Sequence, residues 1–187
     1  MEQFVQKDDV EIIWKSFLLN PDIKTDPSKN IHEYLSEIKG ISLAQAKQMN
    51  YQVTQMASEV GLEYNFDTAV IANSFDAHRF SHFAKKYNKQ NEAEEALFKS
   101  YFTEGKNTAD TDTLVQLAED IGLDGEELRK ILESDEYINE VRHDMEEAAE
   151  FGISGVPFFV FDRKYAVRGA QDSAVFLQTM DKIMVNG

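Results

Sequence analysis

Hydrophobic residues along the chain follow different spacings in different segments. Residues 10–19, "VEIIWKSFLL", form a short apolar run rich in β-branched and aromatic side chains, and Asn20-Pro21 ends it. That combination predicts a buried strand, which we place at Glu11 to Phe17. From Lys29 to Gly152 apolar residues recur at helical spacing and no proline interrupts them, so this block predicts helices without strands.

Capping residues divide the helical block into separate helices. Ser42 with Gln45, and Asp124 with Glu127, each place a hydrogen-bonding side chain three residues before a second polar side chain. Both pairs match the capping box that begins many helices. Asp112 is predicted to cap a further helix N-terminus, because a short acidic side chain can accept a hydrogen bond from the first turn.

The spacing becomes strand-like again after Pro157. The run "FFVFD" predicts a strand, Arg163-Lys164 a turn, and "YAVRG" a strand that returns beside the first. Asp172 is then predicted to cap a last helix that ends near Val185. Because two parallel strands need a crossover connection, we interpret the long helical block as a crossover enlarged into a domain.

These elements predict an α/β fold in which a small sheet carries a large all-helical insertion. We assign residues 1–28 and 152–187 to the sheet domain and residues 29–151 to the helical insertion domain.

Charge and composition limit the classes of partner. The chain has 187 residues, a net charge of -15 and no cysteine. The acidic surface repels phosphate, so we expect neither nucleic acid nor an anionic membrane as a partner. No apolar run approaches the roughly 20 residues that span a bilayer, and "MEQFVQKDDV" lacks the features of a signal peptide. Without cysteine there is no disulfide, thiolate or cysteine-type zinc site in these residues.

Other polar residues offer weaker candidates for chemistry. His78 and His82 lie one helical turn apart with Asp76 nearby, a spacing that suits a metal, but no third ligand is evident. We therefore expect no metal and no cofactor. The preferred interpretation is a helix face on which His78 and Arg79 approach an active-site cleft or lie in solvent.

Three further polar residues are predicted to have no chemical role. His32 and His143 stand alone in acidic helical segments and are expected at the surface. Ser154 lies in "GISG", which lacks the spacing of a nucleophile elbow, so we interpret it as a loop serine.

Several stretches of the chain resemble one known family. The segment after the helical block, with a proline before a strand, a hairpin, "GAQ" and a last helix, is similar to the C-terminal half of a thioredoxin fold. The whole set resembles the DsbA family, and within it the FrnE-like branch. The matching stretches are "SFLLNPD" at Ser16 to Asp22, "NSFDAHRF" at Asn73 to Phe80, "ALFKSYFTEG" at Ala96 to Gly105 and "GISGVPFFV" at Gly152 to Val160.

The resemblance implies which residues would bind substrate. Pro157 would be a cis-proline beside the active site, and the backbone of Val156 would pair with an extended substrate segment, next to Gly155. Asn73 and His78, from the "NSFDAHRF" stretch, are the other implied substrate-binding residues. From the residues alone, the alternative is a trans proline that only begins a strand.

The chain departs from this family in one respect. The family's chemistry belongs to a C-x-x-C motif between its first strand and first helix, and these residues have no cysteine. Met1 to Lys7 resembles only the end of that helix. We therefore interpret the sequence as truncated before the motif by about twenty residues, with the first strand missing. The strand at Glu11 to Phe17 and the strand after Pro157 would then lose their shared neighbour, which predicts a gap in the sheet that is filled by a neighbouring chain or by rearrangement. A homo-oligomer formed through exposed sheet edges is the first of these two outcomes.

Three functions remain open at this point. The resemblance implies a thiol–disulfide oxidoreductase in the complete form, acting on a protein or on a small thiol or disulfide such as glutathione, and inactive in the chain given. It also permits a glutathione-dependent isomerase of the 2-hydroxychromene-2-carboxylate type. The third interpretation is a cysteine-free peptide-binding or chaperone-like module. We expect a cytoplasmic location for the protein.

Overall fold

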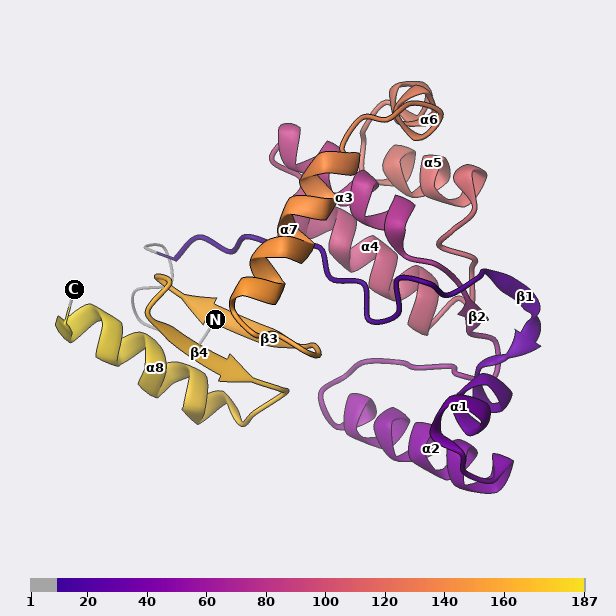
Figure 1. The fold of residues 1–187 in the computed structure, drawn as a ribbon, viewed down its shortest axis with the longest axis horizontal. Helices are drawn as coiled ribbons and strands as arrows, with labels where there is room; N and C mark the ends of the chain where they lie inside the picture. The colour runs from indigo at the N-terminus through magenta and orange to yellow at the C-terminus, as the bar shows by residue number, and fades with distance from the viewer. Residues whose placement is uncertain (1–9, 187) are drawn as a thin grey trace. The chain divides into compact units, whose positions relative to one another are not determined.

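The computed structural model describes residues 10–186 of the chain (Figure 1). The resemblance noted for Met1 to Lys7 lies outside the described residues. In chain order the elements are β1 (Asp26–Asn30), α1 (Ile31–Lys39), α2 (Leu43–Glu59), β2 (Val70–Ile71), α3 (Phe75–Lys86), α4 (Gln90–Phe102), α5 (Thr111–Asp120), α6 (Gly125–Leu132), α7 (Ile138–Glu150), β3 (Phe158–Phe161), β4 (Tyr165–Arg168) and α8 (Ser173–Asn186).

The chain divides into two compact units. The helical unit is Asn20–Arg142, and the hairpin unit combines the described residues up to Leu19 with those from His143 onward. Both boundaries fall earlier in the chain than the predicted domain limits at residues 28 and 151, and the second one lies within α7. The domain assignment made from the sequence stays a prediction.

The helical unit has its core among α3, α4, α5 and α6. The largest side chains with no exposed surface in it are Phe80 and Phe83 of α3, Leu114 of α5 and Leu128 of α6. Each buried side chain of this size contributes about 1.5–3 kcal/mol relative to exposure. These residues recur at the helical spacing seen in the sequence, and the predicted helix-rich α/β fold is confirmed.

The helix N-termini test the capping predictions. The Ser42 side chain accepts a hydrogen bond in a complete capping box, and the Asp124 side chain caps α6 as predicted. The prediction for Asp112 is wrong, because α5 begins at Thr111 and Asp110 caps it by accepting a hydrogen bond from the Thr113 N–H at 2.9 Å. Asp110 and Asp112 have the same side chain, so residue type alone does not show which of them caps the helix.

A short antiparallel pair, β1 and β2, also belongs to the helical unit. Asp26 pairs with Ile71 and Asn30 with Val70, with an irregularity between them. The helical spacing from Lys29 to Gly152 predicts no strand here, and β2 corrects that prediction. A two-residue strand paired with the polar segment "DPSKN" has no apolar alternation, so periodicity had nothing to detect.

The hairpin unit contains β3 and β4, with α8 packed against them. The strands pair antiparallel from Phe158 opposite Arg168 to Phe161 opposite Tyr165. The turn has positive φ at both Asp162 and Arg163, the backbone of the type I′ turns that favour two-stranded hairpins. The ring of Phe176 in α8 meets the ring of Phe159 edge to face, with centroids 4.8 Å apart.

The predicted strand at Glu11 to Phe17 is not present, since none of these residues pairs with a strand. The segment instead runs beside α7, where the Ser16 N–H donates to Asp144 Oδ2 at 2.9 Å and the Leu18 N–H lies 3.0 Å from the Met145 sulfur. A strand needs a neighbouring strand to complete its ladder. Among residues 10–186, β3 pairs only with β4, an arrangement that agrees with the predicted incomplete sheet.

Candidate functional site

The loop that leads into β3 holds three of the predicted site residues. Gly152, with φ of +68°, ends α7 in the left-handed conformation, and the Ile153 N–H then donates to the Ala148 carbonyl at 2.9 Å. Gly155 is half-buried, whereas Val156 is 52% exposed and the Val156–Pro157 peptide bond is cis. The loop therefore leaves Val156 accessible just before a strand.

The end of β4 supports this loop at two points. The Gly169 N–H donates to the Pro157 carbonyl at 2.9 Å, and Arg168 Nη2 donates to Ser154 Oγ at 3.0 Å. Ser154 is exposed and accepts this hydrogen bond, which fits its interpretation as a loop serine. The loop is thus fixed to the hairpin on both sides of Val156 while that residue stays accessible.

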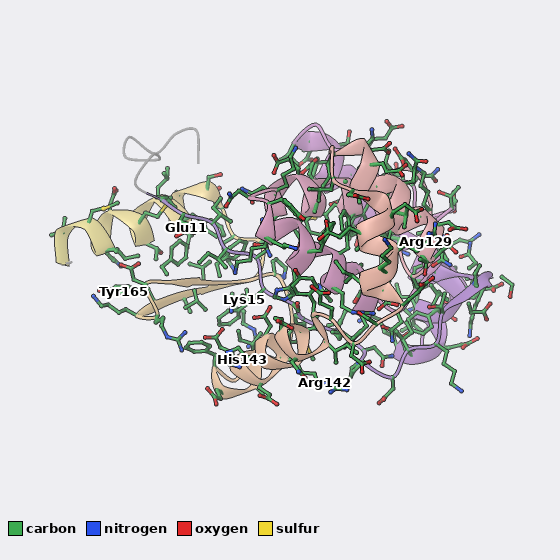
Figure 2. All side chains as sticks on the ribbon, turned by 90° about the horizontal axis from the view of Figure 1, so that it is seen from above. Glu11, Lys15, Arg129, Arg142, His143 and Tyr165 are labelled. Atoms are coloured by element: carbon green, nitrogen blue, oxygen red, sulfur yellow. The ribbon has the colours of Figure 1, made fainter. Side chains whose placement is uncertain are left out.

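A network of charged side chains, not predicted from the sequence, joins the segment before Leu19 to α7. Asp144 is only 3% exposed, and Lys15, which is labelled in Figure 2, lies 2.8 Å from one of the Asp144 oxygens and 3.1 Å from a Glu147 oxygen. Burial lowers the pKa of Lys15, but hydrogen bonds to the two carboxylates outweigh this and leave it raised. Hydrogen bonds from Arg163 and Lys15 lower the pKa of Glu147.

The sequence does contain a signal for this network. Val141, Asp144 and Ala148 share one face of α7, and all three are buried. A carboxylate at the middle position of an otherwise apolar stripe needs a cationic partner, because a buried charge is otherwise costly. Lys15, which interrupts an apolar run, matches that need.

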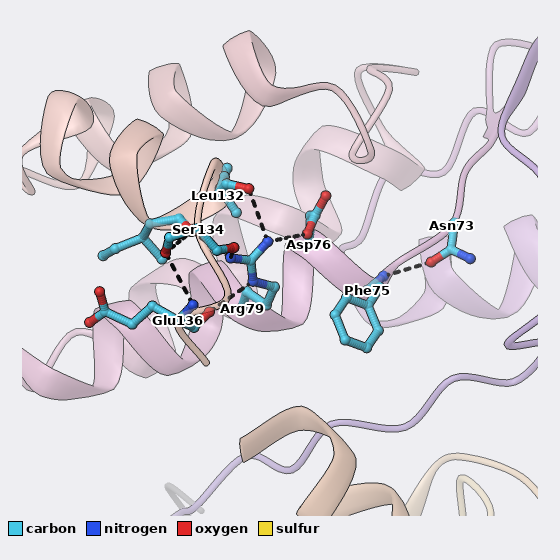
Figure 3. Close-up of polar contacts among 8 residues, drawn as sticks. Asn73, Phe75, Asp76, Arg79, Leu132, Ser134 and Glu136 are labelled. Atoms are coloured by element: carbon cyan, nitrogen blue, oxygen red, sulfur yellow. Dashed lines mark hydrogen bonds and ion pairs between the residues drawn. The ribbon is translucent and has the colours of Figure 1, made fainter. Parts of the chain in front are cut away.

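Asn73 is engaged inside the helical unit. Its Nδ2 donates to the carbonyls of Pro21 at 3.3 Å and Ile23 at 3.0 Å, and its Oδ1 accepts from the Phe75 N–H at 2.9 Å (Figure 3). Its own N–H donates to Thr25 Oγ1 at 3.0 Å. Asn73 therefore anchors residues 21–25 and the start of α3, and a role in substrate binding stays a prediction.

His78 is half-buried in the first half of α3. It belongs to the helical unit together with Asn73, whereas Gly155, Val156 and Pro157 belong to the hairpin unit. The predicted substrate-binding residues thus come from both units, three from one loop and two from around the start of one helix.

The burial of Arg79 corrects the interpretation that its side chain approaches a cleft or lies in solvent. It is 4% exposed, and its guanidinium donates to carbonyls of the segment that ends α6 and follows it (Figure 3). The distances are 2.9 Å to Glu136 and 3.2 Å to Leu132, with further hydrogen bonds to the Ile131 and Ser134 carbonyls. The side chain satisfies carbonyls that a helix end leaves without partners.

The remaining histidines differ in position. His32 is 4% exposed, which corrects the prediction that it lies at the surface. Its Nε2 lies 3.0 Å from Asp67 Oδ1 and its Nδ1 lies 2.9 Å from Asn50 Nδ2, so two polar neighbours satisfy the buried ring. His143 is exposed, as predicted (Figure 2). The ring of His82 is stacked on that of Tyr137.

The described residues contain neither a cluster of metal ligands nor a helix that could span a membrane. Among residues 10–186, no group of three or more His, Cys, Asp or Glu side chains is arranged to hold a metal ion. None of the helices that the structure describes has the length and apolar character needed to cross a bilayer.

Comparison with known proteins places the chain in a family. The family model for the DSBA-like thioredoxin domain matches residues 1–181. The uncharacterized protein YwbO of Bacillus subtilis (strain 168) is 32% identical in an alignment of 183 positions that covers 94% of this chain and 83% of YwbO. The crystal structure of the probable DsbA oxidoreductase SCO1869 from Streptomyces coelicolor is similar, with a TM-score of 0.91 and 34% identity over 97% of this chain and 78% of that one. The chain belongs to the family of DsbA-like thioredoxin domains.

Proposed function

We propose that this chain forms the substrate-binding part of a thiol–disulfide oxidoreductase of the FrnE-like branch of the DsbA family. The observation that carries the proposal is the exposed loop Gly155–Pro157, which leads into β3 in a chain that belongs to this family. The similarity to a probable DsbA oxidoreductase supports it.

The loop is suited to bind an extended peptide. The ladder between β3 and β4 begins at Phe158, so Val156 lies before its first pair and exposes half of its surface. An extended segment adds to such a backbone as an extra strand, with main-chain hydrogen bonds giving affinity. Because Gly169 and Arg168 hold the loop, little conformational entropy is lost when a peptide binds.

The redox chemistry needs two thiols that these 187 residues do not contain. In the proposed reaction a cysteine thiolate attacks a substrate disulfide and forms a mixed disulfide, which releases one substrate thiol. A second cysteine then attacks the mixed disulfide, so the protein is oxidised to a disulfide as the substrate is reduced to two thiols. Both cysteines would come from residues other than these 187. Glutathione as a substrate and a cytoplasmic location remain parts of the proposal.

Peptide binding by the chain itself tests the first half of the proposal. We expect that titration of the isotopically labelled chain with an extended peptide shifts the amide resonances of Gly155, Val156 and Phe158, and leaves those of α8 unchanged. The control is the same peptide with proline at alternate positions, which removes main-chain donors. Equal shifts with both peptides, or no shift at the loop, would contradict the proposal.

Activity tests the second half. The coding sequence upstream of Met1 is expressed together with these residues, and reduction of insulin disulfides is measured. We expect turnover in the longer protein that is lost when its cysteines are replaced by serine. A longer protein without a cysteine pair, or one that contains the pair and leaves insulin intact, would refute the oxidoreductase assignment.

A further inference from the structure

One side chain of the hairpin unit places a charge beside the loop Gly155–Pro157. Arg168 is the last residue of β4, and the hairpin register sets it opposite Phe158, the first residue of β3 (Figure 1). Its side chain reaches back to the loop, where Nη2 donates to Ser154 Oγ at 3.0 Å. Ser154 and Val156 are two residues apart, so their Cα atoms are separated by at most about 7 Å. The guanidinium therefore lies within side-chain reach of a peptide that pairs with Val156.

Arg168 supplies the charge of this part of the hairpin unit. Residues 151–161, which include the loop and β3, contain no Asp, Glu, Lys or Arg, and residues 165–167 of β4 contain none either. The charged turn at residues 162–164 is at the other end of the strands, because Lys164 is separated from Arg168 by roughly 13 Å of extended chain. A charged group of a peptide at the loop would therefore meet the guanidinium of Arg168 first.

Most of the hydrogen-bonding capacity of this guanidinium is unused. Arginine carries five side-chain N–H donors, and Arg168 is exposed. Among the described residues of the hairpin unit, Ser154 engages one donor and no carboxylate pairs with Arg168. Because a serine hydroxyl is uncharged, it holds the guanidinium beside the loop without neutralising it. A guanidinium in this state can bind a carboxylate through two parallel hydrogen bonds.

We propose that Arg168 makes the loop select extended peptide segments that carry an Asp or Glu next to the residue paired with Val156. The peptide backbone pairs with Val156, and the guanidinium donates to the carboxylate of the peptide. This inference rests on the proposed function, because it needs a peptide bound at the loop. It also opposes the long-range field of the chain, since a protein with a net charge of -15 repels acidic peptides. A preference for an acidic peptide therefore requires a cation at the site.

Three peptides of one length and one central sequence test the proposal, with glutamate, glutamine or lysine on both sides of the centre. Their affinities are measured at low salt from the amide shifts of Val156 and Phe158 in the labelled chain. We expect the wild type to bind the glutamate peptide about threefold to tenfold more tightly than the glutamine peptide, as for one well-placed ion pair. In Arg168→Gln this preference should disappear, and the lysine peptide, which the net charge favours, should bind most tightly. Arg168→Lys keeps the charge but not the planar fork, and should keep part of the preference.

The matched control is Lys164→Gln, which removes the same charge at the far end of the hairpin and should keep the wild-type preference. Arg168→Gln also removes the contact with Ser154. If it weakens all three peptides by the same factor, Arg168 only supports the loop and the proposal is overturned. Equal binding of the glutamate and glutamine peptides by the wild type overturns it as well, and leaves the proposed function intact because both peptides bind at the loop. If no peptide shifts Val156, the proposed function fails together with this inference.

Discussion

Removal of the Arg79 guanidinium gives a direct measure of how the end of α6 is held. Arg79 is 4% exposed and donates to the carbonyls of Ile131, Leu132, Ser134 and Glu136. In Arg79→Met the aliphatic part of the side chain is kept and the donors are lost. A buried acceptor left without its partner costs about 1–3 kcal/mol, and a charged donor adds to the strength of the lost bonds.

The four losses do not add fully. Several of these carbonyls are only partly buried, so water replaces some of the lost hydrogen bonds. The Asp76 carboxylate that also pairs with Arg79 is 41% exposed and is rehydrated at little cost. We therefore expect a loss of about 3–5 kcal/mol, because each buried acceptor left unpaired costs about 1–3 kcal/mol and water replaces only part of the four hydrogen bonds. For a chain of this size, that lowers the melting temperature by about 6–20 °C.

Urea and thermal unfolding followed by circular dichroism measure the loss. The matched control is Arg129→Met, because Arg129 lies on α6 and pairs at 2.7 Å with Asp112, whose side chain is 80% exposed. We expect the control to cost less than about 1 kcal/mol. If Arg79→Met and Arg129→Met cost the same, the interpretation of Arg79 as the clamp on this helix end is wrong.

Three further substitutions test other parts of the structure. Burial raises the pKa of Glu94 above 4.5, so the folded protein favours its protonated form and loses stability as pH rises above 4.5 through the raised pKa. Glu94→Gln should therefore melt higher than wild type at pH 7 and equal to it at pH 4; an equal gain at both would contradict this. Asp144→Ala should lower the free energy of unfolding, measured in urea, by about 3 kcal/mol, because Asp144 is buried and pairs with Lys15. A decrease below about 1 kcal/mol would refute a structural role for Asp144. Gly105→Ala should unfold at a much lower temperature than Gly40→Ala. An added Cβ at Gly105 would lie 2.6 Å from the Thr68 carbonyl oxygen, whereas an added Cβ at Gly40 meets nothing within 4 Å. Equal melting temperatures of the two variants would contradict this prediction.

Features that depend on neighbours in the sequence were predictable. The capping box at Ser42, the cap at Asp124 and the turn before Lys164 each involve residues within a few positions, so their chemistry is visible in a short window. The loop at Val156 was proposed from a short motif that carried the resemblance, and its role in substrate binding stays a prediction. The family assigned from these motifs is confirmed by the comparisons.

Features that depend on partners far away in the sequence were not predictable. The acceptors of Arg79 lie more than fifty positions away, so nothing beside it in the sequence distinguishes a buried clamp from a residue in a cleft. The buried ring of His32 likewise depends on Asp67 and Asn50. The prediction of a strand at Glu11 to Phe17 was wrong because a strand-like composition does not supply a partner strand. Two N–H groups of this part of the chain donate to Asp144 and Met145 instead.

The buried charges divide between the two units. Arg79 and its carbonyl partners belong to the helical unit, whereas Asp144 and Lys15 belong to the hairpin unit, so each unit has its own internal polar anchor. The proposed substrate loop at Val156 lies in the hairpin unit. Because the loop shares no polar anchor with Arg79, we expect the Arg79→Met variant to bind peptide at the loop as the wild type does, at a temperature at which the variant is folded. Loss of loop binding in the folded variant would mean that the two units are coupled.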